Sequence, residues 1–245
     1  MELIWNMNRE NFQTTNKNIR DRLLDILNSN EENLLIGLWN SFSKNYRKLY
    51  IKSAKRYWDW WLGKYKYKVI TTVDINKIYA STAMSRFYFD YKDRSHVSEY
   101  VKKLKMIWDN KDIVMIEGEK TRLGLGNDLF NNANSIQRIL CPNSNAFDVY
   151  DKILNEALKI DKNKLIITAL GPTATILAYD LYKAGYQIID IGHVDIEYEW
   201  YLRNSTSMVK IENKIVVQAE GGTNNINDVV QDEDYNKQII ARISN

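Results

Sequence analysis

The second half of this chain alternates continuous apolar runs with segments of helical periodicity, and this alternation restricts its fold more than any other feature. The run "KLIITAL" at 164–170 is typical of a strand buried on both faces of a sheet. The segment at 172–185 has Pro in its first turn and Gly past its end, as helices do. Further strands are predicted at 112–118, 135–142 and 187–192, and a further helix at 146–160. Strands alternating with helices predict an α/β fold, in which helices cover both faces of a parallel sheet.

The first half of the chain is predicted to be mostly helical. Helices are expected at 17–29, 53–65 and 96–110, and a short strand at 33–38. Beyond the alternating region, 209–218 is predicted to form a two-stranded ribbon, followed by a polar loop. No repeat or low-complexity linker divides the sequence, so we expect a single domain over residues 1–245.

Composition argues against several classes of protein. The 34 Lys and Arg residues nearly balance the 31 Asp and Glu residues, and the net charge of +3 does not favour nucleic-acid binding. A single cysteine, Cys141, excludes an internal disulfide framework and suits a reducing compartment. There is neither a secretory leader nor an apolar run approaching the ~20 residues of a membrane span. We therefore expect a soluble cytoplasmic protein with no nucleic-acid partner and no membrane span.

Ligands of parallel sheets bind beyond the carboxyl ends of the strands, and two such ends carry residues suited to anions. In the loop "EGEKTRLGLGND" (117–128), Gly124 and Gly126 allow backbone N–H groups to converge, while Lys120 and Arg122 supply positive charge. A flexible loop with paired charges is an equally good interpretation. After the strand at 164–170, Gly171 precedes a helix whose free N–H groups would suit a phosphate. An ordinary strand-to-helix turn explains this second segment better when it is taken alone.

The stretch "DIGHVDIEYEW" (190–200) follows the predicted strand at 187–192, which we expect to be buried. Asp195 and Glu199 are four residues apart, so a helix places both on one face and Glu197 elsewhere. The helix dipole alone explains acids in a first turn. It does not explain His193, nor Glu199 between two aromatic residues, where a carboxylate gains proton affinity suited to a general base. Oxygen and nitrogen donors of Asp195 and His193 suit Mn²⁺ or Mg²⁺.

Two aromatic segments have alternative interpretations. In "SRFYFDYKDRS" (85–95), Arg86 beside aromatic rings could pair with a phosphate, or the segment could be a strand edge with solvated charges. The segment "RYWDWWLGKYKYKV" (56–69) resembles platforms that stack on bases or sugars. A helix that buries one aromatic face is the favoured interpretation of this segment.

Three long blocks together resemble the GT-D type glycosyltransferases, a family once labelled a domain of unknown function. They are "EGEKTRLGLGNDLFNNANSIQRILCPNSNAF", "ALGPTATILAYDLYKAGYQIIDIGHVDIEYEW" and "SRFYFDYKDRS". The resemblance covers roughly residues 12–240. It implies a Rossmann-like fold, a UDP-sugar donor (usually UDP-glucose), a divalent metal (usually Mn²⁺), and a role in glycosylating serine-rich repeat adhesins or building surface polysaccharide in Gram-positive bacteria.

The resemblance also implies roles for individual residues. Glu199 would be the general base, with Glu197 next in line, and His193 would contact the metal or the diphosphate, with Asp195 beside it as a metal ligand. The nucleotide would be held by Arg86, by the loop residues Lys120, Arg122, Gly124, Gly126, Asn127 and Asp128, and by the turn of Gly171, Pro172 and Thr173.

One feature departs from the family pattern. Members carry an Asp-Gly-Glu motif, a D-x-E metal site, near the N-terminus, and this chain instead begins "MELIWNMNRENF". Glu2 would occupy a neighbouring position. We therefore expect a truncated family member that is inactive or weakly active, because two metal-binding charges and one strand are missing.

Two other interpretations of function stay open. Gly171 and Asp190, 19 residues apart (190 − 171), mimic the glycine and ribose-binding acid of dinucleotide enzymes, so an NAD- or S-adenosylmethionine-binding enzyme is one alternative. A non-catalytic glycan-binding subunit that uses the Trp-rich helix is the other. The glycan or glycoprotein acceptor and assembly into an oligomer of identical chains are left undecided by the residues.

Overall fold

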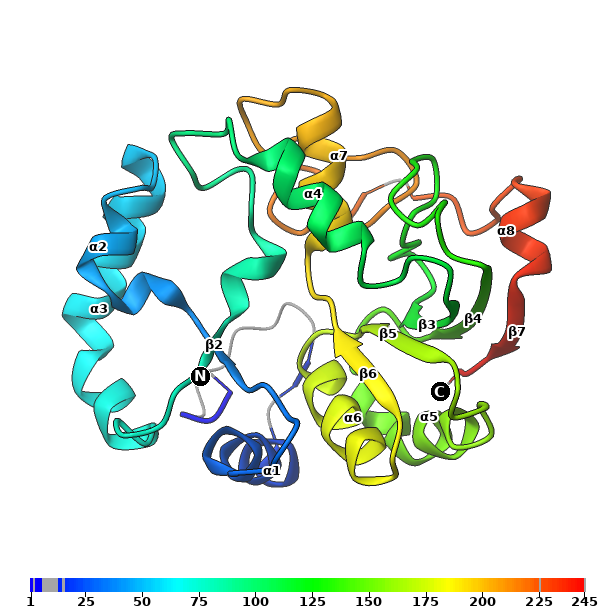
Figure 1. Ribbon diagram of the computed structural model, residues 1–245, viewed down its shortest axis with the longest axis horizontal. Helices are drawn as coiled ribbons and strands as arrows, with labels where there is room; N and C mark the ends of the chain where they lie inside the picture. Colours follow the sequence, from blue (N-terminus) through cyan, green and yellow to red (C-terminus); the bar gives the residue numbers. More distant parts are fainter. Residues whose placement is uncertain (2, 6–12, 15, 225, 245) are drawn as a thin grey trace.

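The fold is built on one parallel five-stranded sheet with the order β6–β5–β3–β4–β7 (Figure 1). The computed structural model describes residues 1, 3–5, 13–14, 16–224 and 226–244. The strands are β3 (Asp112–Gly118), β4 (Ser135–Cys141), β5 (Leu165–Ala169), β6 (Gln187–Asp190) and β7 (Ile239–Arg242). The predicted strands at 112–118, 135–142 and 164–170 are therefore confirmed.

Helices cover both faces of the sheet because its central strands are apolar on both sides (Figure 1). In β3, Ile113 and Met115 pack in one core with α4 (Val97–Lys105) and α7 (Val194–Leu202). Their neighbours Val114 and Ile116 pack in a second core with α1 (Lys17–Asn28), α5 (Tyr150–Ala157) and α6 (Pro172–Lys183). This arrangement confirms the predicted α/β class with helices on both faces.

The N-terminal part is helical, as predicted, and it carries a third core of aromatic side chains. Its helices are α1, α2 (Lys44–Arg47), α3 (Lys52–Thr72) and α4, and β1 (Gly37–Leu38) pairs in parallel with β2 (Ala80–Ser81). On α3, Trp58, Trp61 and Tyr65 are buried, which confirms that the Trp-rich helix hides one aromatic face. Among the helices of the described residues, none combines the length and apolar character needed to cross a bilayer.

Two expectations about strands were wrong, and one strand was missed. The segment 209–218 forms turns and no two-stranded ribbon. β6 lies at the edge of the sheet, so Gln187 and Asp190 are exposed and its two isoleucines are only half-buried. β7 was missed, because a four-residue edge strand inside a polar tail has too short an apolar pattern to stand out.

The aromatic core on α3 leads to a prediction about Trp58 and Trp60, two residues apart on this helix. The Trp58 ring lies 5.1 Å from that of Trp39 and 5.8 Å from that of Trp61, whereas Trp60 is 53% exposed. Trp58→Ala should lower the free energy of unfolding by ~3–5 kcal/mol, the usual cost of removing a buried Trp. Trp60→Ala should lower it by less than ~1 kcal/mol, because that ring is largely in solvent. Urea unfolding of both variants would measure the difference, and equal losses would contradict the assignment of faces.

Candidate active site

The helix α7 starts at the carboxyl end of β6 and is buried around its whole circumference. Every residue from 194 to 200 is buried, including Asp195, Glu197 and Glu199. The carboxylates therefore do not form a solvated helix start. Since burying a carboxylate without partners is costly, the partners of each one show what this helix does.

Asp195 and Glu199 lie on one face of α7, as their spacing predicts, and they share two partners. The Asn127 Nδ2 atom donates to Asp195 Oδ1 at 2.9 Å and to Glu199 Oε1 at 2.8 Å. The ammonium of Lys214, itself only 1% exposed, donates to Asp195 Oδ2 at 2.7 Å and to Glu199 Oε1 at 3.2 Å. The backbone N–H of Gly124 completes the set by donating to Asp195 Oδ1 at 2.9 Å.

Glu197 points to a different set of groups. Its Oε2 atom accepts hydrogen bonds from the backbone N–H groups of Tyr88 and Phe89, at 2.8 and 2.9 Å. Its Oε1 atom is buried and has no partner within the described part of the chain. Burial raises the pKa of Glu197 to about 7, against the opposing effect of these N–H groups and of the nearby Arg86 charge. Glu197 is thus a carboxyl group poised between its two protonation states near neutral pH.

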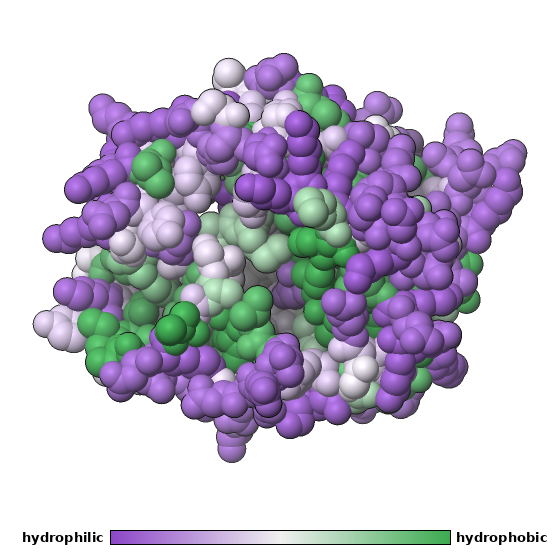
Figure 2. Space-filling model, viewed as in Figure 1, coloured by the Kyte–Doolittle hydropathy of each residue, from purple (hydrophilic) through white to green (hydrophobic). Residues whose placement is uncertain are grey.

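His193 and Arg86 lie on the same side of α7 as Glu197. Burial, together with the Arg86 charge, lowers the pKa of His193 well below its usual value, so the imidazole is neutral at physiological pH. Two buried polar atoms here, His193 Nε2 and Thr82 Oγ1, have no partner among the residues described. Nor does any hydrogen bond or ion pair join the Arg86 guanidinium to residues 16–224 or 226–244. In the view of Figure 2, the surface is hollowed between the side formed by α2 and α3 and the side formed by β6 and α6.

Asp190, at the end of β6, holds the neighbouring turn. It accepts hydrogen bonds from Thr175 Oγ1 of α6 at 3.0 Å and from the Gly192 backbone N–H at 3.2 Å. Protein atoms crowded around its carboxyl group raise the pKa of Asp190 to about 6, although the residue keeps an exposed surface. These contacts join α6 to the start of α7 and fix the turn that carries His193.

Most charged side chains of the predicted nucleotide-binding loop bond to other parts of the protein. The Arg122 guanidinium is buried and donates to the backbone carbonyls of residues 119, 213, 227 and 228. Lys120 pairs with Asp228 at 2.7 Å, and Asp128 accepts from Lys105 and from Tyr198 Oη. The Gly124 backbone N–H does donate to an anion, as predicted for a glycine in this loop. The anion is the Asp195 carboxylate and not a ligand. Gly126 has a positive φ of 79° and open space around it.

The turn before α6 has the geometry expected of an anion site only in part. Gly171 has a positive φ of 56° and precedes Pro172, the first residue of α6. The hydroxyl of Thr173 is buried and donates to Gln13 Oε1 at 3.4 Å, and the same oxygen accepts from the Phe147 N–H at 3.1 Å. The N-terminus of α6 is therefore partly covered by Gln13, while Gly171 itself stays exposed.

The predicted metal ligands do not form a metal site by themselves. Asp195 is fully engaged by Gly124, Asn127 and Lys214, none of which contacts His193. The Lys214 ammonium already bridges the two carboxylates that a divalent cation would need, and it offsets one of their two negative charges. In the described ranges, no three His, Cys, Asp or Glu side chains are placed to share an ion. Glu2, the remaining candidate, lies outside the described residues.

Sequence reasoning missed Lys214 and the two backbone N–H groups that hold Glu197. Lys214 sits in a turn, with no periodicity to mark it as buried. A backbone N–H leaves no signature in a sequence at all. Only the spacing of Asp195 and Glu199 could have indicated that a shared partner exists.

Comparison with known proteins decides the family. A model of the glycosyltransferase GT-D fold matches residues 1–219. The chain belongs to the GT-D glycosyltransferase family. A solved structure of the domain of unknown function 1792, reported to have a distinct glycosyltransferase fold, matches this GT-D chain with a TM-score of 0.91 and 39% identity, covering 99% of this chain and 86% of that one.

Two curated glycosyltransferases of streptococci are similar to this GT-D chain. It is 44% identical over 167 residues to Glycosyltransferase GlyD of Streptococcus pneumoniae serotype 4 (strain ATCC BAA-334 / TIGR4), a match covering 68% of this chain and 20% of that protein. It is 40% identical over 166 residues to the Probable glycosyl transferase Gly of Streptococcus gordonii, covering 68% and 24%. The match thus spans only a fifth to a quarter of these relatives.

The raised pKa of Glu197 makes stability depend on pH. The folded state holds this proton up to about pH 7, whereas an unfolded glutamate loses it near ~4.3. The free energy of unfolding should therefore fall as the pH rises from ~4.5 to ~7, by on the order of 3 kcal/mol from this group, and stay level above that. Glu197→Gln should remove this slope, measured by urea unfolding between about pH 5 and pH 8.

The matched control is Glu99→Gln, at an exposed position of α4. It should leave the pH dependence of the free energy of unfolding as in the wild type. A Glu197→Gln variant that kept the full slope would show that another group titrates.

Proposed function

We propose that this chain transfers a hexose, by resemblance glucose, from a UDP-sugar to a hydroxyl of a glycan or glycoprotein, using the carboxyl edge of the sheet where β6 leads into α7. The observation that carries the proposal is the Arg86 guanidinium, which has no hydrogen-bonding partner among the described residues and lies beside buried, unpartnered atoms of His193 and Glu197. Groups left in this state gain free energy when a polar ligand binds.

Arg86 suits the diphosphate of such a donor. A guanidinium presents parallel N–H donors that match phosphate oxygens, and a partly buried site strengthens the attraction. The neutral His193 can exchange one hydrogen bond with the same ligand through Nε2. Glu197 positions this region, because its bonds to the N–H groups of Tyr88 and Phe89 fix the segment that carries Arg86.

The transfer breaks the bond between the sugar's anomeric carbon and the UDP oxygen and forms a bond from that carbon to the acceptor oxygen. The acceptor proton must go to a base, and the electron pair of the broken bond stays on UDP, where Arg86 stabilises the charge. We assign the base to Glu199. Its Oε2 atom is held only by the half-exposed Arg203, at 3.2 Å, within the described contacts, and such an exposed pair opens at little cost.

Metal dependence stays a prediction. Mn²⁺ or Mg²⁺ would stabilise charge on a departing diphosphate. The described residues do not provide a ligand set for it, so no step is assigned to a metal. A cytoplasmic location and an oligomer of identical chains are likewise predictions.

The role of Arg86 predicts a selective loss of donor binding. Arg86→Gln should weaken UDP binding by about 10- to 100-fold, because hydrogen bonds to charged groups contribute ~1.5–3 kcal/mol. Arg56→Gln, at an exposed position on α3, should leave UDP binding unchanged. Calorimetric titration of both variants with UDP, NAD and S-adenosylmethionine would measure this. Binding of NAD or S-adenosylmethionine in place of UDP would favour the alternative enzyme classes.

The role of Glu199 predicts a loss of rate without a loss of binding. Glu199→Gln should reduce hexose transfer by ~10²–10⁴-fold, the usual contribution of a general base, and leave UDP affinity nearly intact. Glu197→Gln should instead weaken UDP binding, because it loosens the segment that carries Arg86. Release of UDP in the presence of acceptor, together with UDP titration, separates the two effects. Normal turnover by Glu199→Gln would move the base to Glu197 or Asp195.

A further inference from the structure

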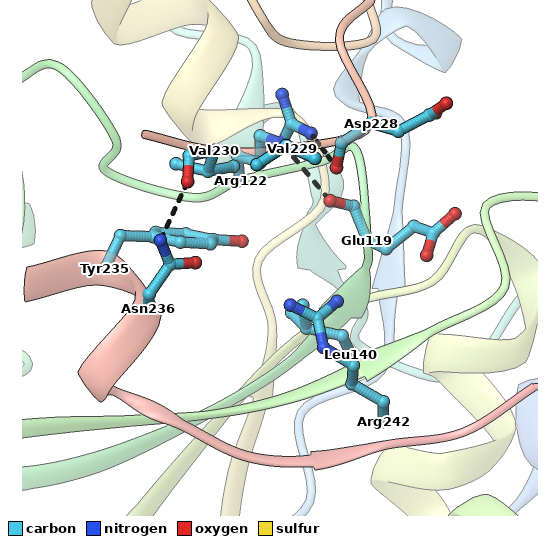
Figure 3. A pocket seen from close by; sticks show the side chains of 9 residues that line it. All are labelled: Glu119, Arg122, Leu140, Asp228, Val229, Val230, Tyr235, Asn236 and Arg242. Carbon is cyan, nitrogen blue, oxygen red and sulfur yellow. Dashed lines mark hydrogen bonds between the residues drawn. The ribbon is translucent and has the colours of Figure 1, made fainter. Parts of the chain in front are cut away.

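A second site lies at the other side of the sheet, where β4 and β7 end. Here an open cavity of about 290 Å³ lies between the ends of these strands and the segment 228–236, which passes above them (Figure 3). β6, which leads into the candidate active site, forms the opposite edge of the same sheet. The volume is near the ~300 Å³ lower limit of small-molecule sites, so the cavity suits a ligand smaller than a nucleotide sugar.

One buried polar group of this cavity lacks a partner. Tyr235 is only 3% exposed, and its hydroxyl makes no hydrogen bond within the described residues. Figure 3 shows the ring lying flat across one side with the hydroxyl directed into the cavity. The Arg138 guanidinium packs 4.4 Å from the centre of the ring and holds it in place. Since an unpaired buried hydroxyl is costly, a ligand that bonds to it would gain that free energy.

Two solvent-exposed charged groups of opposite sign also face this cavity, Glu119 and Arg242. The Arg242 guanidinium points into it in Figure 3 and has no hydrogen bond or ion pair to the described residues. The Glu119 carboxylate accepts one hydrogen bond, from Asn143 Nδ2 at 3.3 Å. The other charges nearby are already engaged, since Arg122 donates to backbone carbonyls and Asp228 pairs with Lys120.

We propose that this cavity binds a single hexopyranose unit. A neutral ligand with many hydroxyl groups can accept from Arg242 and Tyr235 while it donates to Glu119, so all three groups are satisfied together. An anion would meet the Glu119 carboxylate, and a cation would meet Arg242. Leu140 and Val230 offer apolar surface to the C–H groups of a pyranose ring. The ligand would bond to none of Arg86, His193, Glu197 and Glu199, so the site does not depend on the proposed transferase chemistry.

Titration of the full chain with glucose, followed by ligand-observed NMR, tests the proposal. Wild-type protein should bind glucose, and Tyr235→Phe and Arg242→Ala should each weaken binding about tenfold, as expected for the loss of one hydrogen bond to the ligand. Arg20→Ala, at a partly exposed position on α1 outside the lining of the cavity, is the matched control and should bind as the wild type does. Inorganic phosphate, titrated in parallel, should not bind.

Thermal unfolding shows whether a loss of binding comes from loss of structure. Tyr235→Phe should have the same midpoint as the wild type or a higher one, because the removed hydroxyl has no partner in the folded state. Absence of glucose binding to the wild type, binding of phosphate instead, or equal glucose binding by all three variants would overturn the proposal.

Discussion

The structure around α7 depends on one ammonium group shared by two buried carboxylates. Without Lys214, Asp195 and Glu199 would face each other as like charges in a place that water does not reach. The effective penalty for burying such charges is several kcal/mol for each ion, so the ammonium that bridges both carboxylates is what allows this helix to be buried. Arg122 supports this arrangement by holding the carbonyl of Asn213, the residue directly before Lys214.

The same helix separates satisfied polar groups from unsatisfied ones. On the Asp195 and Glu199 face, hydrogen bonds from Asn127, Lys214 and the Gly124 N–H complete the set. On the Glu197 face, one carboxylate oxygen and one imidazole nitrogen remain without partners, next to Arg86. Polar groups whose hydrogen bonds are all made hold the helix in one position. Buried polar groups without partners gain the most free energy when a ligand binds. The Glu197 face therefore suits donor binding. The other face keeps the helix in the orientation that presents it, and only Glu199 Oε2, held by the half-exposed Arg203, is left there to accept a proton.

Elements of the fold that depend on local interactions could be predicted from the sequence, and contacts between distant segments could not. The strands at 112–118 and 164–170 are long apolar runs, and α6 carries Pro172 at its start and Gly185 past its end, so these elements were predicted closely. The i, i+4 spacing correctly paired Asp195 with Glu199. The partners of these carboxylates were not predicted, because Lys214 reaches them from a turn without regular structure. Arg122 and Lys120 have the composition of an anion site, and only the tertiary structure shows that backbone carbonyls and Asp228 engage them.

The strands that border the sheet are its shortest. β6 and β7 each have four residues, while the three strands between them have five to seven. A long, flat, apolar border would offer its free N–H and C=O groups to a strand of another molecule. Here β6 begins with Gln187 and ends with Asp190, and β7 ends with Arg242. Each edge strand is therefore short and has a polar or charged residue at an end. The fold thereby limits the intermolecular strand pairing that leads to aggregation.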